Sequence, residues 1–218
     1  MADTPQDDTS PVQVEAEAFL ATLHSRRSIR AFQARPVPRQ VLERILEAAI
    51  WAPSASNVQP WRFTVLRGQR KQELADLLRD CVDHLRPGLN PVLWVHRSGL
   101  RRSAQIIESS AATIIAWATL TPDGARLRLV ARGDLIPLFS WTMVVQSVAA
   151  AVQNLLLAAH ALGLGAVWMG YPSLAGPQIG EWLGEDGELM ATVALGYPAA
   201  TPSTGKRRPL RDVVRWEG

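Results

Sequence analysis

FSWTMVVQSVAAAVQNLLLAAHAL, residues 139–162, is the longest apolar stretch of the sequence and the one that decides its fold. Its apolar residues recur at helical spacing, and they occupy nearly every side of the helix they predict. The polar residues that interrupt it are Gln146, Gln153, Asn154 and His160. Because of these interruptions, a membrane span is a weaker interpretation than a buried helix. A helix that is apolar all round must be enclosed on every side, and in a chain this short a second subunit can supply part of the enclosure.

Helices and strands are mixed along the rest of the chain. After this helix, which Gly163 and Gly165 close, the patterns predict a strand over 166–169, a helix over 176–183 and a core strand over 190–195. Before it, they predict a short helix from Phe19 toward Arg26, an amphipathic helix over 36–52, a strand over 61–66, a helix over 69–85 and a strand over 111–120. A helix remains the competing interpretation of 111–120. Residues 86–105 fit no element well, and 121–138 are expected to form a turn, a short strand and a return loop.

Length and composition favour one globular domain. The chain has 218 residues, 47% of them hydrophobic and 20% charged, which excludes disordered, collagen-like and disulfide-stapled proteins. The first 17 residues hold five acidic residues and no basic one, so we expect a flexible acidic leader followed by a single domain over residues 18–218. The whole chain carries a net charge of +3, and without the five leader acids the remainder carries +8.

Cysteine usage and the N-terminus predict a cytoplasmic protein. The single cysteine, Cys81, excludes an intrachain disulfide and a multi-cysteine zinc site, and it lies on the apolar side of its predicted helix, which favours an inert thiol. The leader has neither the positive charge nor the apolar run of a secretory signal.

Several common functional motifs are missing or misplaced. Gly163-Leu164-Gly165 follows a helix and precedes a strand, the reverse of a dinucleotide-binding turn, so a helix cap is the better interpretation. The four histidines are dispersed without metal-ligand spacing, and we predict no metal site. Aromatic residues do not alternate with the basic ones, so we predict no nucleic-acid partner.

Three polar clusters do stand out. Arg26-Arg27-Ser28-Ile29-Arg30 places three guanidiniums and a hydroxyl within five residues, a group that can surround a phosphate. Lys206-Arg207-Arg208 is a second basic run near the other end of the chain. Residues 52–61, APSASNVQPW, form a proline-bracketed polar loop whose hydroxyls, amides and free N–H groups suit a flat polar ring. Each basic run taken alone is more often a solvated surface run.

Together these clusters resemble the FMN-dependent nitroreductase family. The resemblance runs from Arg26 through Pro36-Val37-Pro38 and the polar loop to Trp61. It resumes over 154–159 (NLLLAA), 163–168 (GLGAVW) and 194–198 (ALGYP), and it closes on 206–210 (KRRPL). About 60% of the chain is covered in the family's order, and the combination is far more specific than any single piece.

The resemblance implies an α+β sandwich with a mixed, mainly antiparallel sheet flanked by helices, assembled as an intertwined homodimer with FMN at the interface. The long apolar helix then corresponds to the central helix of the dimer. The residues implied to hold the phosphate and the pyrimidine edge of FMN are Arg26, Arg27, Ser28, Arg30, Lys206 and Arg208. Residues implied to line the ring from the other subunit are Pro53, Ser54, Ala55, Ser56 and Asn57. Trp168, Met169 and Gly170 are implied to pass beside the ring, and family positions that contribute an Asn and a Lys fall near Arg102 and Gln105.

The resemblance also implies the reaction. We expect an FMN-dependent oxidoreductase that uses NAD(P)H to reduce nitroaromatics, quinones or a related conjugated acceptor by ping-pong hydride transfer. No side-chain acid or base is required for that chemistry, so no catalytic residue is assigned. Alternatives are a relative that consumes reduced FMN, like 5,6-dimethylbenzimidazole synthase, a ring dehydrogenase, and a flavin-binding protein without turnover.

Overall fold

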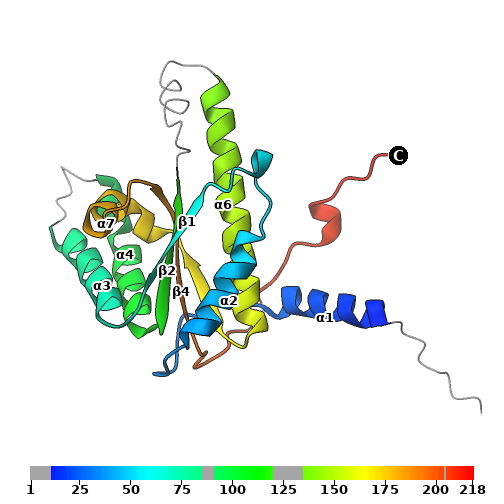
Figure 1. Cartoon of the computed structure of the whole chain (residues 1–218), viewed down its shortest axis with the longest axis horizontal. Helices are drawn as coiled ribbons and strands as arrows, with labels where there is room; N and C mark the ends of the chain where they lie inside the picture. Colours follow the sequence, from blue (N-terminus) through cyan, green and yellow to red (C-terminus); the bar gives the residue numbers. More distant parts are fainter. Residues whose placement is uncertain (1–10, 85–90, 120–134, 204) are drawn as a thin grey trace, which may run out of the picture.

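The computed structural model describes residues 11–84, 91–119, 135–203 and 205–218, and Figure 1 shows their arrangement. The longer helices are α1 (Pro11–Ser25), α2 (Arg39–Ile50), α3 (Gly68–Asp83), α4 (Pro91–Ser109) and α6 (Leu135–Ala161). Helix α7 (Gly176–Leu183) is shorter. The strands are β1 (Trp61–Leu66), β2 (Ala112–Ala118), β3 (Gly165–Met169) and β4 (Glu188–Gly196). Single 3₁₀ turns are η1 (Ala55–Asn57), η3 (Tyr171–Ala175) and η4 (Leu210–Asp212). The elements expected over 36–52, 61–66, 69–85, 111–120 and 176–183 are confirmed with small shifts at their ends.

The sheet has four strands in the order β1-β2-β4-β3, and each pair of neighbours is antiparallel. A β-bulge at Ala116/Trp117 shifts the register between β2 and β4. Within the described residues, the parallel component is one isolated bridge between Ser28 and Ala166 of β3. The predicted α+β class with a mainly antiparallel sheet is therefore confirmed, and the bridge attaches the segment after α1 to an edge strand.

Helices cover both faces of the sheet, with α2 and α6 on one side and α3, α4 and α7 on the other (Figure 1). Side chains of β2 alternate between the two layers: Ile114 packs in the cluster of α2 and α6, whereas Ile115 and Trp117 pack with α3 and α4. All seven residues of β2 are consequently buried. A strand enclosed on both faces shows a continuous apolar run, which explains why its sequence alone also allowed a helix.

The long apolar helix begins and ends close to the expected residues. It starts at Leu135, so residues 135–138 belong to α6 and not to the return loop expected there, and Pro137 lies in the first turn, where proline is tolerated. The rest of the segment predicted over 121–138 lies outside the described residues. Gly163 has a φ of +77°, and the N–H of Leu164 donates to Ala159 O at 2.8 Å. The Gly-Leu-Gly sequence is thus a left-handed helix cap, as predicted.

Only one face of α6 is fully enclosed by its own chain. The buried apolar residues form a single stripe at helical spacing, with the buried Ser147 beside it: Val148, Ala151, Val152, Leu155, Leu156 and Ala159. Residues 141–161 are long and apolar enough to cross a membrane, with a mean hydropathy of 1.5, and 39% of that stretch is buried. Because the stripe packs in the core with α2 and the sheet, α6 serves as a core helix. Among the described residues, its other apolar side chains are mostly half-buried.

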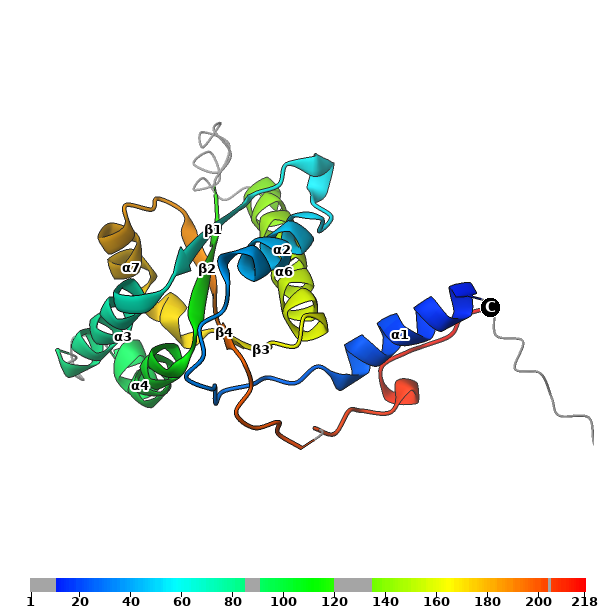
Figure 2. The same ribbon diagram turned by 60° about the horizontal axis from the view of Figure 1, so that its bottom comes forward.

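Both ends of the described chain extend away from the body on the same side (Figure 2). Helix α1 begins at Pro11, so residues 11–17 are helical and not part of a flexible leader; residues 1–10 lie outside the described residues. Phe19 on α1 is 60% exposed and Trp216 in the C-terminal tail is 85% exposed. Among the described residues, neither side chain has a neighbour that covers it.

The largest difference from the sequence analysis is α4. Residues 91–109 form a helix, although the arginine-rich stretch 86–105 fitted no element well. Leu100, Ala104 and Ile107 are buried at helical spacing, while Arg101 and Arg102 are exposed. The arginines and Gly99 obscured this stripe in the sequence, since glycine lowers helix propensity by about 1 kcal/mol.

Candidate functional site

The first basic cluster is fixed to the edge of the sheet. Helix α1 ends at Ser25, and the half-buried Arg26, Arg27 and Ser28 follow it. The bridge from Ser28 to Ala166 and the hydrogen bond from the N–H of Ile29 to Ala166 O (3.1 Å) hold the segment against β3. Ile29 is buried and acts as the anchor. The chain therefore presents these arginines from a rigid support.

The fold places residues of the two basic clusters near enough for their charges to act on each other. Burial lowers the pKa of Arg26, and the positive charges of Arg207 and then Arg27 lower it further. Among the described residues, no carboxylate is a cause of that shift. Arg207 belongs to the C-terminal basic run, so two segments about 180 residues apart in the sequence share one region of positive potential. Like charges held together in this way favour an anionic ligand, because a phosphate relieves their repulsion.

One residue of this region was not foreseen from the sequence. His160, near the end of α6, lies with its Nε2 2.8 Å from Ser25 Oγ. Burial lowers the pKa of His160, and the charges of Arg26 and Arg27 add to the effect. The histidine is therefore kept neutral beside the arginines and links α6 to the end of α1. The dispersed histidines offered no spacing signal that pointed to this contact.

A cavity of about 470 Å³ lies beside β3 and below α4. Its lining comes from the segment after α1, from the middle of α4 and from β3 with the residues that follow it: Arg30, Gly99, Arg102, Ser103, Ile106 and residues 167–171. Trp168 is 39% exposed although it lies within a strand, and Gly170 has open space around its Cα. A flat polar ring placed here would meet two guanidiniums and an accessible backbone.

Close packing between α4 and η3 shapes this cavity. A Cβ added at Gly99 would lie 2.5 Å from carbon atoms of the Tyr171 ring, so only glycine allows the helix to approach so near. The ring of Tyr171 also contacts that of His96, with centroids 5.7 Å apart. The glycine that obscured the helix in the sequence is thus required to bring Arg102 to the cavity.

Some of the predicted cofactor-binding residues line this cavity and others do not. Of the residues near the loosely matched middle positions, Arg102 lines the cavity, whereas Gln105 lies exposed one turn further along α4 and is not among the lining residues. Arg30, Trp168, Met169 and Gly170 line the cavity as expected from their predicted roles. Lys206 and Arg208 are exposed in the tail. The contacts of all these residues with a cofactor stay predictions.

The predicted ring-lining loop, residues 53–57, has an unusual backbone. Ser56, Asn57 and Gln59 have φ angles of +51°, +53° and +51°, a region that residues other than glycine seldom adopt. Ser54 holds the loop together, because its Oγ accepts a hydrogen bond from the N–H of Gln59 at 3.0 Å. Strained residues clustered in one loop often mark a functional site.

Within one chain this loop lies apart from the cavity. Residues 53–57 are not among its lining residues, and η1 contacts α6 on the side away from α4 (Figures 1 and 2). Pro53, Ala55, Ser56 and Asn57 are exposed, and Ser54 is half-buried. A loop and a cavity separated by the central helix can form one site only if a second chain brings them together.

Other chemistry is less prominent. Among the described residues, no group of three or more His, Cys, Asp or Glu side chains is arranged to hold a metal ion. Burial raises the pKa of the Cys81 thiol, and the charge of Asp80 raises it further, which agrees with an unreactive cysteine.

Comparisons with known proteins support this arrangement. The model of the nitroreductase family matches residues 23–197. An NADH dehydrogenase of Thermus thermophilus is 34% identical over 213 residues, which covers 88% of this chain and 92% of that protein. A Desulfovibrio desulfuricans protein solved in complex with FMN is 30% identical with a TM-score of 0.67, over 92% of this chain and 96% of its own. A BluB-like flavoprotein of Clostridium difficile reaches a TM-score of 0.71 at 23% identity, over 91% and 98% of the two chains, and shows the fold alone.

The family match covers well over half of the chain, and it includes the first basic cluster, the polar loop, α6 and β3. The resemblance found in the sequence is confirmed. The chain belongs to the nitroreductase family, a family of oxidoreductases.

Proposed function

We propose that the chain is an NAD(P)H-dependent FMN oxidoreductase that reduces nitroaromatics, quinones or a related conjugated acceptor by ping-pong hydride transfer. The observation that carries this proposal is the group of like charges formed by Arg26, Arg27 and Arg207, close to a cavity beside β3 that Arg30 and Arg102 line. The family match and the FMN complex of the Desulfovibrio relative support it.

The residues present fit FMN. Arg26, Arg27 and Ser28, joined by Lys206 and Arg208 from the tail, would hold the phosphate through charge-assisted hydrogen bonds. Arg30 would approach the pyrimidine edge of the ring, with Arg102 of the same cavity. Trp168, Met169 and Gly170 would pass beside the ring and offer backbone N–H groups to it.

The protein's part in catalysis is positioning and electrostatics. When bound, FMN would accept two electrons and a proton equivalent from the nicotinamide and pass them to the acceptor. Fixed guanidiniums at Arg30 and Arg102 would favour negative charge at the pyrimidine edge, since they need no reorganisation during the reaction. The open space at Gly170 leaves room for donor and acceptor to stack in turn. We assign no side chain as a general acid or base.

We further propose that the functional unit is a homodimer in which residues 53–57 of one chain complete the site of the other. The half-buried apolar side chains of α6, the exposed apolar residues of α1 and those of the tail provide surface for the partner. The loop and the cavity lie on different sides of α6, which supports an exchange of this kind. Sedimentation of the purified protein is expected to give twice the chain mass of 23.9 kDa, and a monomer would contradict the proposal.

Complementation tests the shared site directly. Arg26→Gln removes a charge from the proposed phosphate-binding part of the site. Asn57→Gly removes the side-chain amide of the loop, and glycine adopts the positive φ of this position without strain. Each variant alone is expected to bind little FMN. After unfolding and refolding as a mixture, about a quarter of the sites should recover, because half of the dimers are mixed and each mixed dimer has one intact site. No recovery would place the whole site within one chain.

A visible spectrum tests the proposed activity. The purified protein, supplied with FMN, is expected to show the oxidised flavin band near about 450 nm and to lose it on anaerobic titration with NADH or NADPH. Parallel double-reciprocal plots with a nitroaromatic or quinone acceptor would support the ping-pong order, and intersecting lines would contradict it.

Other outcomes distinguish the alternatives. A protein that stays colourless with FMN overturns the proposal. Flavin that binds without bleaching indicates a binding protein without turnover, and a benzimidazole product from reduced FMN and oxygen indicates a flavin-consuming synthase. We expect the protein to act in the cytoplasm, and no nucleic acid or membrane takes part in the proposed reaction.

A further inference from the structure

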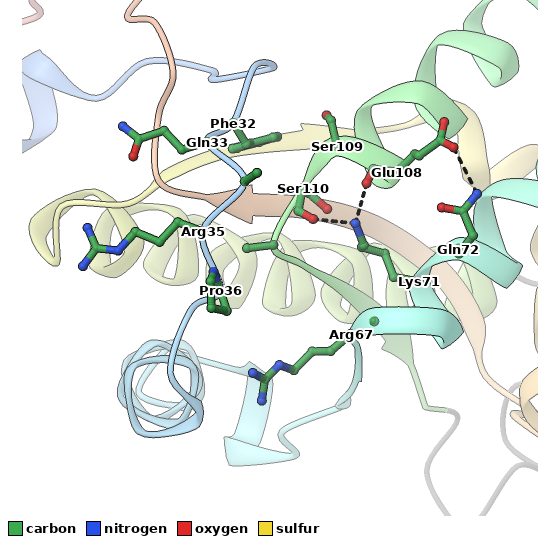
Figure 3. A pocket seen from close by; sticks show the side chains of 13 residues that line it. Phe32, Gln33, Arg35, Pro36, Arg67, Lys71, Gln72, Glu108, Ser109 and Ser110 are labelled. Atoms are coloured by element: carbon green, nitrogen blue, oxygen red, sulfur yellow. Dashed lines mark hydrogen bonds between the residues drawn. The ribbon is translucent and has the colours of Figure 1, made fainter.

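A second and larger cavity, of about 860 Å³, opens where β1 ends and β2 begins. Its walls are residues 32–36, the first turn of α3 with the residue before it, and residues 108–111 at the end of α4 (Figure 3). It shares no lining residue with the cavity beside β3. The first cavity lies beside the edge strand β3, whereas this one lies past the end of β1 and before the start of β2.

Three cations line this second cavity. Lys71 is 8% exposed, and its Nζ donates to Glu108 O and Ser110 O, both at 2.5 Å, which leaves one of its three N–H groups for another partner. Arg35 lies over the ring of Tyr197 at 3.8 Å. Arg67 donates from Nη2 to Val37 O at 3.1 Å. Main-chain carbonyls and an aromatic face hold these groups in place, but they do not neutralise their charge.

The cavity has little negative charge to balance them. Glu108 is the carboxylate among its lining residues, and its side chain points to Gln72 and Arg79, as Figure 3 shows for Gln72. Glu108 Oε1 accepts from Gln72 Nε2 at 3.1 Å, and Oε2 pairs with Arg79. Burial lowers the pKa of Lys71, and the charge of Glu108, which also pairs with Arg79 outside the lining, raises it. With one carboxylate against Arg35, Arg67 and Lys71, the lining carries a net positive charge.

Helix α3 adds to this potential. Its N-terminus lies in the cavity wall, with Gly68 and Lys71 among the lining residues. Arg67 at the N-cap makes no side-chain cap, and the first turn contains no acidic residue. The free N–H groups and the positive end of the helix dipole therefore remain uncompensated beside the three cations. Gly68 has nothing within 4 Å of the place of a Cβ, so the backbone there is accessible.

We propose that this cavity binds a phosphate-bearing small molecule of nucleotide size, at a site separate from the one proposed for the flavin. Arg35, Arg67 and the first turn of α3 would contact the phosphates. Phe32 and Pro36 supply apolar surface in the same cavity for a ring, and Gln33 and Ser109 supply hydrogen-bonding groups. The volume is ample for a nucleoside diphosphate, and the charge favours two phosphates over one.

Calorimetric titration of the full chain at fixed ionic strength tests the site, with pyrophosphate, ADP and adenosine as probes. The protein is saturated with FMN first, so that the phosphate cluster along β3 is filled. Saturable binding of ADP or pyrophosphate is expected. Tighter binding of ADP would identify a nucleotide ligand, and equal binding would identify the inorganic anion. Absence of binding by both, or binding of adenosine as tight as that of ADP, overturns the proposal.

Variants locate the binding. Arg35→Gln and Arg67→Gln lie in different walls, and each is expected to weaken ADP binding by about tenfold or more. Arg39→Gln is the matched control, because Arg39 is exposed, pairs with Glu43 and does not line the cavity. Arg26→Gln is expected to leave ADP binding unchanged, even if it abolishes FMN binding, so this proposal and the flavin proposal can fail separately. Equal affinities in wild type and both cavity variants would refute the assignment.

Discussion

The arginines of this chain fall into two kinds of environment. Arg62, Arg70 and Arg79 each bond to at least one carboxylate, and hydrogen bonding to Glu185 raises the pKa of Arg62. Arg26 has a lowered pKa instead, because burial and two neighbouring arginines act on it. The same residue type thus forms surface ion pairs in one region, and in another it stands beside like charges, where we propose an anion site.

The two environments differ in the charge of the neighbouring group and not in the number of arginines. A surface pair satisfies itself and contributes at most about 1 kcal/mol to stability. The repulsion among Arg26, Arg27 and Arg207 would be relieved only when an anion binds to them. In a chain with 23 basic residues, the missing carboxylate is therefore a better sign of a binding site than the density of positive charge.

The largest expected effect comes from removing one of the positive charges gathered around Arg26. Arg26→Gln should raise the dissociation constant of FMN about 10- to 100-fold, because it removes a charge-assisted hydrogen bond to the phosphate. Titration of flavin fluorescence measures the change. Arg39→Gln, which breaks a surface pair, serves as the control. Equal FMN affinities in the two variants would show that Arg26 is no more important for the flavin than a surface-paired arginine.

The opposite kind of arginine should affect stability instead. Arg62 donates from Nη1 to Glu185 at 2.8 Å, and Thr64 donates to the same carboxylate at 3.0 Å. Arg62→Gln is expected to lower the free energy of unfolding by up to about 1 kcal/mol, or the Tm by about 2–4 °C. Flavin affinity should not change, and a change there would link this pair to the binding site.

A substitution of Arg207 tests whether the two basic runs repel each other. Arg207→Gln should raise the Tm of the flavin-free protein by about 1–2 °C, since it relieves repulsion of Arg26. The same variant should weaken FMN binding, so stability and affinity move in opposite directions. Thermal unfolding with and without FMN measures both effects. A lower Tm without flavin would show that Arg207 has a stabilising partner.

The smallest effect concerns pH. The pKa of His160 lies below its ordinary value through burial, Arg26 and Arg27, so the unfolded chain takes up a proton before the folded one does. Its contribution to stability is present above the ordinary pKa and is lost as the pH falls through the folded pKa. The flavin-free wild type should therefore lose more stability than His160→Asn between about pH 7.5 and about pH 5.5, measured by urea midpoints. Equal losses would contradict this role of His160.

Elements with a clear period were predictable, and those with conflicting signals were not. The helix at 176–183 and the strand at 61–66 have the expected bounds because turn residues flank their apolar patterns. Helix α4 was missed because its exposed arginines and Gly99 counteract a short buried stripe. The start of α1 at Pro11 was missed because Val12 and Val14 are exposed and show no core-facing period.

The candidate site shows the same division. The first basic cluster and the polar loop were visible because unusual residues are adjacent in the chain. Arg102 was placed only loosely, and the contact of His160 with Ser25 was not foreseen, since it spans 135 residues. Side chains that meet through tertiary packing leave no spacing in the sequence.

The sequence by itself determined the family, most of the helices and strands and the central apolar helix, because periodicity and local residue chemistry are written in consecutive residues. Tertiary structure alone decided which arginines pair with acids and which stand beside other arginines. It also decided that α6 is enclosed on one face only, and that the loop and the cavity lie on different sides of it. The physical reason is that burial, charge neutralisation and cavity shape depend on distances between segments far apart in the chain.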